Sequence, residues 1–145
     1  MEKPANRVNR ASGVALIFKD LVLLGKRSPL PGAKFPEYWS IFGGSCNKNE
    51  NPMACACREL LEETEIEIHL SRLKFIRILR NGNSEFVVYA CEMPEMINPI
   101  LNEEHTEYGW FNILSLTSFP EKIDKDIVDS LFMYLDLKKG SDSSR

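Results

Sequence analysis

The sequence predicts an α/β fold in which a mixed β-sheet lies between helices. Strand-like segments stand before, between and after two helical segments, an order typical of layered α/β domains. Two pairs of strand segments are joined by short turns, which indicates antiparallel pairs within the sheet. The length of 145 residues fits one domain. We therefore expect residues 1–145 to form a single domain, with loosely ordered ends at 1–10 and 139–145.

The first part of the chain is predicted to form three strands. Ser12–Lys19 and Leu21–Lys26 are rich in aliphatic residues, and the short turn between them predicts a hairpin. Residues 28–36 hold three prolines and a glycine and are expected to form a loop. Tyr38–Phe42 is then a short apolar strand that leads into a pair of glycines.

A helix is expected directly after this strand and its loop. Asn51 is a favoured N-cap residue, and Pro52 suits the first helical position. The helix is predicted to run from Pro52 to about Thr64. Its apolar stripe should pack on the sheet and consist of Met53, Cys57, Leu60, Leu61 and Thr64.

The second part repeats the order of strands followed by a helix. Leu73–Arg80 and Glu85–Glu92 flank Asn81-Gly82-Asn83, which is a strong hairpin signal. Tyr108–Asn112 is predicted to be a further strand. A second helix is expected after a proline, from Glu121 to about Lys138, with apolar residues along one face.

Composition excludes several classes of protein. The formal net charge is −3, which argues against binding to long nucleic acid or to a membrane through a basic surface. No apolar run approaches the length of a membrane span, and the polar N-terminal segment lacks the apolar core of a secretion signal. We therefore expect a cytoplasmic protein without membrane association.

The four cysteines do not form a recognisable metal motif. Cys46, Cys55, Cys57 and Cys91 give no CxxC pair, and residues two apart on a helix do not face each other. Cys46 is interpreted as a small neutral residue, because nothing near it in the sequence would lower its pKa. Reduced thiols are the expectation for all four.

Three carboxylates gather on one face of the first helix. Glu59, Glu62 and Glu63 stand at i, i+3 and i+4, where like charges repel each other. They also lie toward the C-terminus of the helix, which is the unfavourable end for negative charge. A solvated acidic face is one interpretation. A bound divalent cation is the other, and carboxylate oxygens suit Mg²⁺ or Mn²⁺ better than zinc.

The surrounding pattern favours the second interpretation. The segment from Gly44 to Ile66 resembles the Nudix box, G-x5-E-x7-R-E-U-x-E-E-x-G-U, where U is an aliphatic residue. The family glycine is replaced by Glu65, so we expect an altered or mildly strained helix end, at a cost of about 1 kcal/mol if the conformation is kept. The matching positions are Gly44, Glu50, Arg58, Glu59, Leu60, Glu62, Glu63 and Ile66.

The resemblance implies a Nudix-like α/β/α sandwich with a central mixed sheet. It also implies Mg²⁺-dependent hydrolysis of a nucleoside diphosphate linked to another group X, with Mn²⁺ as a substitute ion. The implied metal site consists of Glu59, Glu62, Glu63 and Gly44. Arg58 is then expected to orient a box carboxylate, and Glu50 to support the geometry of loop and helix.

Other residues are assigned through the same resemblance. The general base is Glu107, Glu104 or a glutamate of the box, and these alternatives stay open. Glu59, Glu62 and Arg58 complete the predicted catalytic set. Predicted substrate contacts are Arg27 on a phosphate, Trp39 stacking on a base or else packing in the core, and Gly43 and Gly44 at the turn beside the site. His105 is interpreted as a surface residue.

The identity of X is not encoded in any pattern of the sequence. The expected partner is a nucleotide-type small molecule, and a homodimer is compatible with the chain. The alternative function is a noncatalytic nucleotide-binding module or regulator on the same fold. Loss of the metal glutamates would indicate that alternative, and all three are present.

Overall fold

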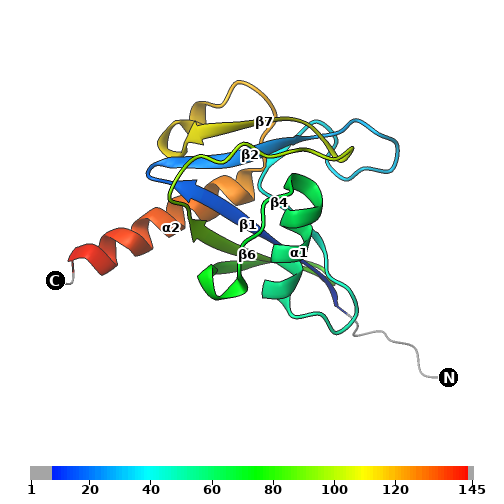
Figure 1. Cartoon of the computed structure of the whole chain (residues 1–145), viewed down its shortest axis with the longest axis horizontal. Helices are drawn as coiled ribbons and strands as arrows, with labels where there is room; N and C mark the ends of the chain where they lie inside the picture. Colours follow the sequence, from blue (N-terminus) through cyan, green and yellow to red (C-terminus); the bar gives the residue numbers. More distant parts are fainter. Residues whose placement is uncertain (1–7, 144–145) are drawn as a thin grey trace.

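The computed structural model describes residues 8–143, in which one mixed sheet is flanked by two helices (Figure 1). No helix within these residues is long and apolar enough to cross a membrane. In chain order the elements are β1 (Asn9–Phe18), β2 (Leu21–Arg27), β3 (Trp39–Ser40), β4 (Phe42–Ser45), α1 (Pro52–Thr64), the short helix η1 (Leu70–Arg72), β5 (Lys74–Asn81), β6 (Ser84–Glu92), β7 (His105–Asn112), the short helix η2 (Ile113–Ser118) and α2 (Lys125–Ser143).

Strand β1 is the centre of the sheet. It pairs antiparallel with β2 near its end and antiparallel with β4 near its beginning, and parallel with β6 along its length. Strand β2 also pairs antiparallel with β3 and β7, and β6 pairs antiparallel with β5. The predicted mixed sheet is therefore confirmed. The predicted β5–β6 hairpin is confirmed as well, with Gly82 at φ 61° in its turn.

The expected strand Tyr38–Phe42 is in fact two short strands. Trp39–Ser40 pairs with β2, whereas Phe42–Ser45 crosses to pair with β1. The break lets the chain change partners, because β2 and β4 both lie beside β1 but at different ends. The prediction for this segment was wrong in that it stopped before Gly43 and Gly44, which belong to β4.

Alternate residues of the central strands supply two separate cores. Val14 and Leu16 face α1, and Ala15 and Ile17 face α2. This alternation follows from the two-residue period of a strand. Helices α1 and α2 thus cover opposite faces of the sheet, which confirms the three-layer arrangement (Figure 1).

The apolar face of α1 differs from the predicted stripe. Leu61 is exposed, whereas Cys55 is completely buried. The remaining buried positions of the helix include Ala56, Leu60 and Thr64. The buried face is therefore rotated toward the side that carries Glu63, because this side packs against β4 as well as β1.

The second helix starts and ends later than the sequence predicts. Its first turn is capped by Asp124, whose Oδ1 accepts hydrogen bonds from the amides of Asp126 and Ile127. An Asp is a strong N-cap residue, so the helix begins after Asp124 and not at Glu121. The secondary structure also reaches further toward both ends than expected, since β1 includes Asn9 and Arg10 and α2 continues to Ser143. Residues 1–7 and 144–145 lie outside the described residues.

Candidate active site

The candidate site lies where β4 runs beside α1. Asn51 caps the helix by accepting the amide of Met53 at 2.7 Å, as the sequence predicts. A Cβ atom on Gly43 would lie 2.6 Å from the Cα atom of Gly13, so the close approach of β4 to β1 requires glycine there. The approach places the backbone of Gly43 and Gly44 directly against the carboxylates of the helix.

Arg58 joins three of the predicted carboxylates. Its Nε and Nη2 atoms form a fork on Glu50, at 2.9 and 3.0 Å. Its Nη1 donates to Glu59 at 2.9 Å and to Glu62 at 3.0 Å. Nη2 also donates to the carbonyl of Ser45 at 3.0 Å, which ties the helix to the end of β4. The guanidinium therefore offsets the repulsion between the like charges of the helix.

Gly44 makes room for Glu59. A Cβ atom at this position would overlap the Glu59 carboxylate, so any larger residue would displace that side chain. Glu59 is mostly covered, and burial raises its pKa although the nearby Arg58 guanidinium lowers it. The requirement for glycine here thus comes from the position of the Glu59 carboxylate.

Glu63 is less accessible than its neighbours in the box. It is only 1% exposed, and its Oε1 accepts the amide of Gly43 at 3.0 Å. Burial, together with the charges of Glu104 and Glu59, raises its pKa to about 9. Glu59, Glu62 and Glu63 therefore share a helix face but not an environment, since the side chain of Glu62 is half exposed.

The structure separates Glu104 and Glu107, the two alternatives for the general base outside the box: Glu104 precedes β7, whereas Glu107 lies on that strand. Glu104 interacts electrostatically with Glu59 and Glu63, so it faces the box. Glu107 instead forms an ion pair with Lys26 at 3.5 Å. It also lines a surface cavity of about 540 Å³ whose apolar walls, including Phe111, belong to the core on the α2 side. Of the two, Glu104 is the one beside the box.

Asn102 positions this loop and was not singled out from the sequence. Its Nδ2 donates to the carbonyl of Glu62 at 3.2 Å and to Glu104 at 3.4 Å, and its Oδ1 accepts the Glu104 amide at 3.0 Å. The amide of Ser28 donates to the carbonyl of Glu104 at 2.9 Å. The only available signal was an Asn two residues before an acidic position, a common turn pattern.

Arg27 and His105 lie on the β2–β7 side of the site. The two residues pair across the strands. Arg27 is close enough for its positive charge to lower the pKa of both Glu63 and His105. The interpretation of His105 as a surface residue was wrong, because it is buried beside the ring of Phe42, with 4.6 Å between ring centroids. Burial lowers its pKa to about 4, so the imidazole is neutral near pH 7.

Trp39 is a core residue in this structure. It is 4% exposed and packs edge-on against Phe111 and Phe119, with centroids 5.3 and 5.7 Å apart. Its Nε1 donates to Glu121 at 3.1 Å. The ring therefore offers no open face on which a base could stack, which favours the core interpretation of this residue.

The end of α1 keeps the left-handed conformation that suits a glycine. Glu65 has φ 59° and ψ 20°, and its amide donates to the carbonyl of Leu61 at 2.9 Å. The helix end is thus strained but not altered, one of the two outcomes expected from the sequence.

The arrangement gathers carboxylates of differing exposure beside a partly exposed arginine. Glu59, Glu62 and Glu104 offer oxygen atoms of the kind that hard divalent cations prefer. The backbone of Gly43 and Gly44 lies against these carboxylates, and Arg27 adds a positive charge nearby. Such a set suits a reaction in which negative charge on phosphate oxygens must be neutralised.

Comparison with known proteins shows the family and the fold of the chain. The family model described as NUDIX domain matches residues 8–131. A MutT NUDIX hydrolase from Burkholderia pseudomallei is similar in structure, with TM-score 0.70, 21% identity and coverage of 88% of this chain and 98% of that one. No curated protein matches the sequence.

Two further solved structures share the fold. A MutT protein from Methanosarcina mazei Go1 gives TM-score 0.74 at 17% identity, covering 92% of this chain and 96% of its own. The NUDIX domain of Shewanella oneidensis NrtR, solved with ADP ribose, gives 0.72 at 17% identity, covering 93% of this chain and 92% of that one. At these identities the likeness concerns the fold.

Proposed function

The chain belongs to the NUDIX domain family, and from this premise we propose that it hydrolyses a nucleoside diphosphate linked to another group X, using Mg²⁺. The products are a nucleotide and phosphorylated X. Hydrolysis of a pyrophosphate bond is what the family supports in general. The substrate class and the ion are the finer parts of the proposal.

The observation that carries the proposal is the network around Arg58. One guanidinium holds together Glu50, at the end of the loop before α1, and Glu59 and Glu62 on the helix. A fold maintained for stability alone gains little from such a cluster, because partly exposed ion pairs contribute only about 0–1 kcal/mol. The cost of gathering like charges is instead explained by a ligand that needs them.

The residues present fit a hard divalent cation. Glu59 and Glu62 supply carboxylate oxygens, and the missing side chain of Gly44 leaves the space that the Glu59 carboxylate occupies. Glu63 accepts a hydrogen bond from the Gly43 amide. It therefore positions the backbone of β4 and does not face solvent. When bound, Mg²⁺ would neutralise charge on the diphosphate and lower the pKa of a water molecule.

The chain's own residues supply binding and proton transfer. Glu104 is proposed as the general base, because it is close enough to the box to interact electrostatically with Glu59 and Glu63. Asn102 positions Glu104 through hydrogen bonds with the Glu104 amide and carboxylate. Arg27 is proposed to bind a phosphate group of the substrate, since its charge already reaches Glu63 from the adjacent strand.

The test is hydrolysis of a substrate panel with Mg²⁺ or Mn²⁺. The panel contains nucleoside triphosphates, ADP-ribose, nucleotide sugars, dinucleoside polyphosphates and RNA with a 5′-triphosphate. We expect turnover of one class, and a loss of about 100-fold or more in kcat for Glu62→Gln. The nucleotide and the phosphorylated second product identify the bond that is cut.

Glu67→Gln is the matched control. Glu67 is exposed and lies past the end of α1, so the same chemical change there should leave turnover intact. Turnover that persists in Glu62→Gln would contradict the proposed site. Nucleotide binding without turnover of any panel member would favour the noncatalytic module.

A further inference from the structure

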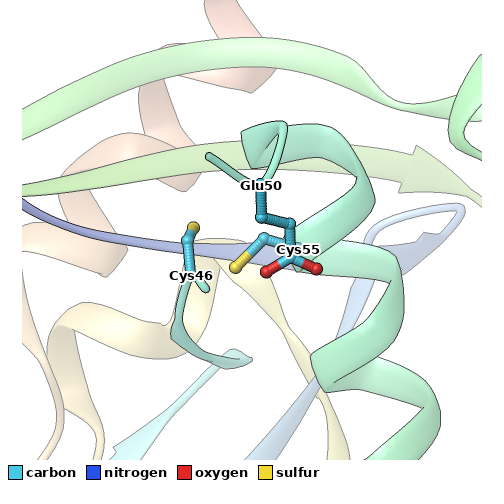
Figure 2. Close-up of side chains that lie close together, drawn as sticks. All are labelled: Cys46, Glu50 and Cys55. Atoms are coloured by element: carbon cyan, nitrogen blue, oxygen red, sulfur yellow. The ribbon is translucent and has the colours of Figure 1, made fainter. Parts of the chain in front are cut away.

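A cluster of sulfur and oxygen ligands lies beside the candidate active site and shares with it only Glu50, which is hydrogen-bonded to Arg58. Among residues 8–143, Cys46, Glu50 and Cys55 each offer one atom, and these atoms lie within 4.8 Å of one another. Figure 2 shows the two sulfurs and the carboxylate pointing toward a common space between the loop and the helix. We propose that this cluster is a second metal site, which takes a soft divalent cation such as Zn²⁺.

The backbone brings the three residues together although the sequence lacks the usual motif. Cys46 follows β4, and its amide donates to the carbonyl of Arg10 at 2.8 Å. Glu50 is held in the same loop, where its Oε1 accepts the Asn47 amide at 2.8 Å. Cys55 belongs to the first turns of α1 and is completely buried. A loop and a helix therefore provide the ligands that a CxxC pair would otherwise supply.

The geometry is close to that of a zinc site. With Zn–S bonds of about 2.3 Å, ligand atoms in a tetrahedral site lie about 3.8 Å apart, so only a small contraction is needed. Cys46 is partly exposed, which gives an entry path and leaves a coordination position for water. The carbonyl of Gly44 lies 3.6 Å from the sulfur of Cys55 and is a further oxygen at the same place.

The charges balance when the ion is bound. Two thiolates and one carboxylate carry three negative charges, which a divalent cation reduces to one. Arg58 supplies the remaining positive charge, since its fork holds Glu50 and its Nη2 lies 4.0 Å from the sulfur of Cys55. The Glu50 atom Oε2 receives a hydrogen bond from Arg58 Nε, whereas Oε1 receives two, so Oε2 keeps a lone pair for the ion.

Cys46 lies against a buried hydroxyl group. Its Sγ lies 3.7 Å from Ser12 Oγ, and Ser12 is completely buried on β1. Ser12 Oγ itself donates to the carbonyl of Pro52 at 2.7 Å, which fixes its orientation. Because that donation uses the only hydroxyl hydrogen, Ser12 Oγ has none left for a Cys46 thiolate, and its role behind this ligand is to position the sulfur.

The donor set separates this site from the carboxylate site. Thiolates select Zn²⁺ and similar soft ions, whereas carboxylates alone suit Mg²⁺ and Mn²⁺. Glu50 and Arg58 link the two sites, but no residue is a ligand in both. The inference therefore holds or fails independently of the proposed hydrolysis.

The test is titration of the reduced, full-length chain with Co²⁺, which replaces Zn²⁺ and reports on its ligands, in the presence of excess Mg²⁺. We expect a thiolate-to-Co²⁺ charge-transfer band that Zn²⁺ abolishes and Mg²⁺ does not. Cys46→Ser should weaken binding by about tenfold or more. Cys57→Ser, on the same helix but outside the cluster, should leave the band unchanged, and so should Glu62→Gln.

A second measurement avoids dependence on variants of the buried cysteine. In the unaltered chain, Zn²⁺ should protect Cys46 from alkylation, as read by mass spectrometry of its peptide, while the rate at Cys57 stays the same. Equal alkylation of Cys46 with and without Zn²⁺ would overturn the proposal. Binding of Co²⁺ to Cys46→Ser with the affinity of the unaltered chain would do so too, as would a purified chain that holds a Cys46–Cys55 disulfide instead of binding the ion.

Discussion

At the scale of single residues, Glu65 adopts the left-handed backbone conformation that favours glycine, although it is not a glycine. The chain ends α1 in a left-handed conformation at a glutamate, since the bond from its amide to Leu61 and the entry into the next segment require that turn. A non-glycine residue is strained there by about 1 kcal/mol. The strain lies at the end of the helix that carries the catalytic candidates.

Glu65→Gly is therefore expected to stabilise the protein. The gain should be up to about 0.5 kcal/mol in the free energy of unfolding, because relief of about 1 kcal/mol of strain is partly offset by the greater freedom of glycine in the unfolded chain. Urea denaturation of both proteins measures it. A matched Glu67→Gly variant, at an exposed position beyond the helix, should not stabilise. A stability loss in Glu65→Gly would contradict the strained conformation.

Single substitutions can also distinguish Glu104 from Glu107 as the general base. Glu104 faces the box and Glu107 pairs with Lys26, so Glu104→Gln should lower kcat by about 100-fold or more. Glu107→Gln removes the same charge from the same strand region and should retain most of the activity. Steady-state kinetics on the substrate found by the panel measure both. The reverse order of effects would assign the base to Glu107.

At the scale of elements, Arg58 links the loop after β4 to α1. Its fork and the amide of Asn47 hold the pKa of Glu50 at about 2, well below its ordinary value of 4.5. The unfolded chain therefore binds more protons than the folded chain between these two values. The contribution of Glu50 is fully present above pH 4.5 and is lost as the pH falls toward 2.

This linkage predicts a specific change in the acid stability of the protein. The free energy of unfolding should decrease less steeply between pH 5 and pH 3 in Glu50→Gln than in the unaltered chain. Urea midpoints at several pH values give the two slopes. Arg10 and Arg80 also hold the pKa of Glu85 low, so Glu85→Gln provides a comparison at a distant ion pair. Parallel curves for Glu50→Gln and the unaltered chain would show that Arg58 does not stabilise Glu50.

Helices and strands were predictable where local sequence signals are strong. They were less predictable where contacts with neighbouring strands determine the structure. The Asn51–Pro52 start of α1 and the Asn81–Asn83 turn follow from short-range chemistry, and both are where the sequence places them. The division of the 39–45 segment into two strands depends on β1 and β2, which no local pattern reveals. The rotated face of α1 likewise depends on β4 packing beside it.

At the scale of the whole molecule, the site joins segments that are distant in the sequence. The spacing of Glu59, Glu62 and Glu63 was sufficient to predict a carboxylate cluster, since one helix carries all three. The burial of Glu63, the approach of Glu104 and the burial of His105 depend on where β4 and the loop before β7 fold. The Cys46–Glu50–Cys55 cluster was missed because its ligands meet only through the loop that links β4 to α1.

A site assembled from distant segments should stabilise the whole fold when its cation binds. Mg²⁺ that binds the folded chain alone raises the free energy of unfolding by about 2.7 kcal/mol at a concentration 100 times its Kd. We therefore expect Tm to rise with added Mg²⁺ and to fall again with a chelator. Because Glu59 and Glu62 supply the oxygens in this proposal, the rise should be largely lost in Glu62→Gln and kept in Glu67→Gln. Thermal unfolding monitored by circular dichroism, with Mg²⁺ varied at constant ionic strength, measures the effect. An equal rise in the chain and in Glu62→Gln would show that Mg²⁺ acts elsewhere on the molecule, and the carboxylate cluster would then need another explanation.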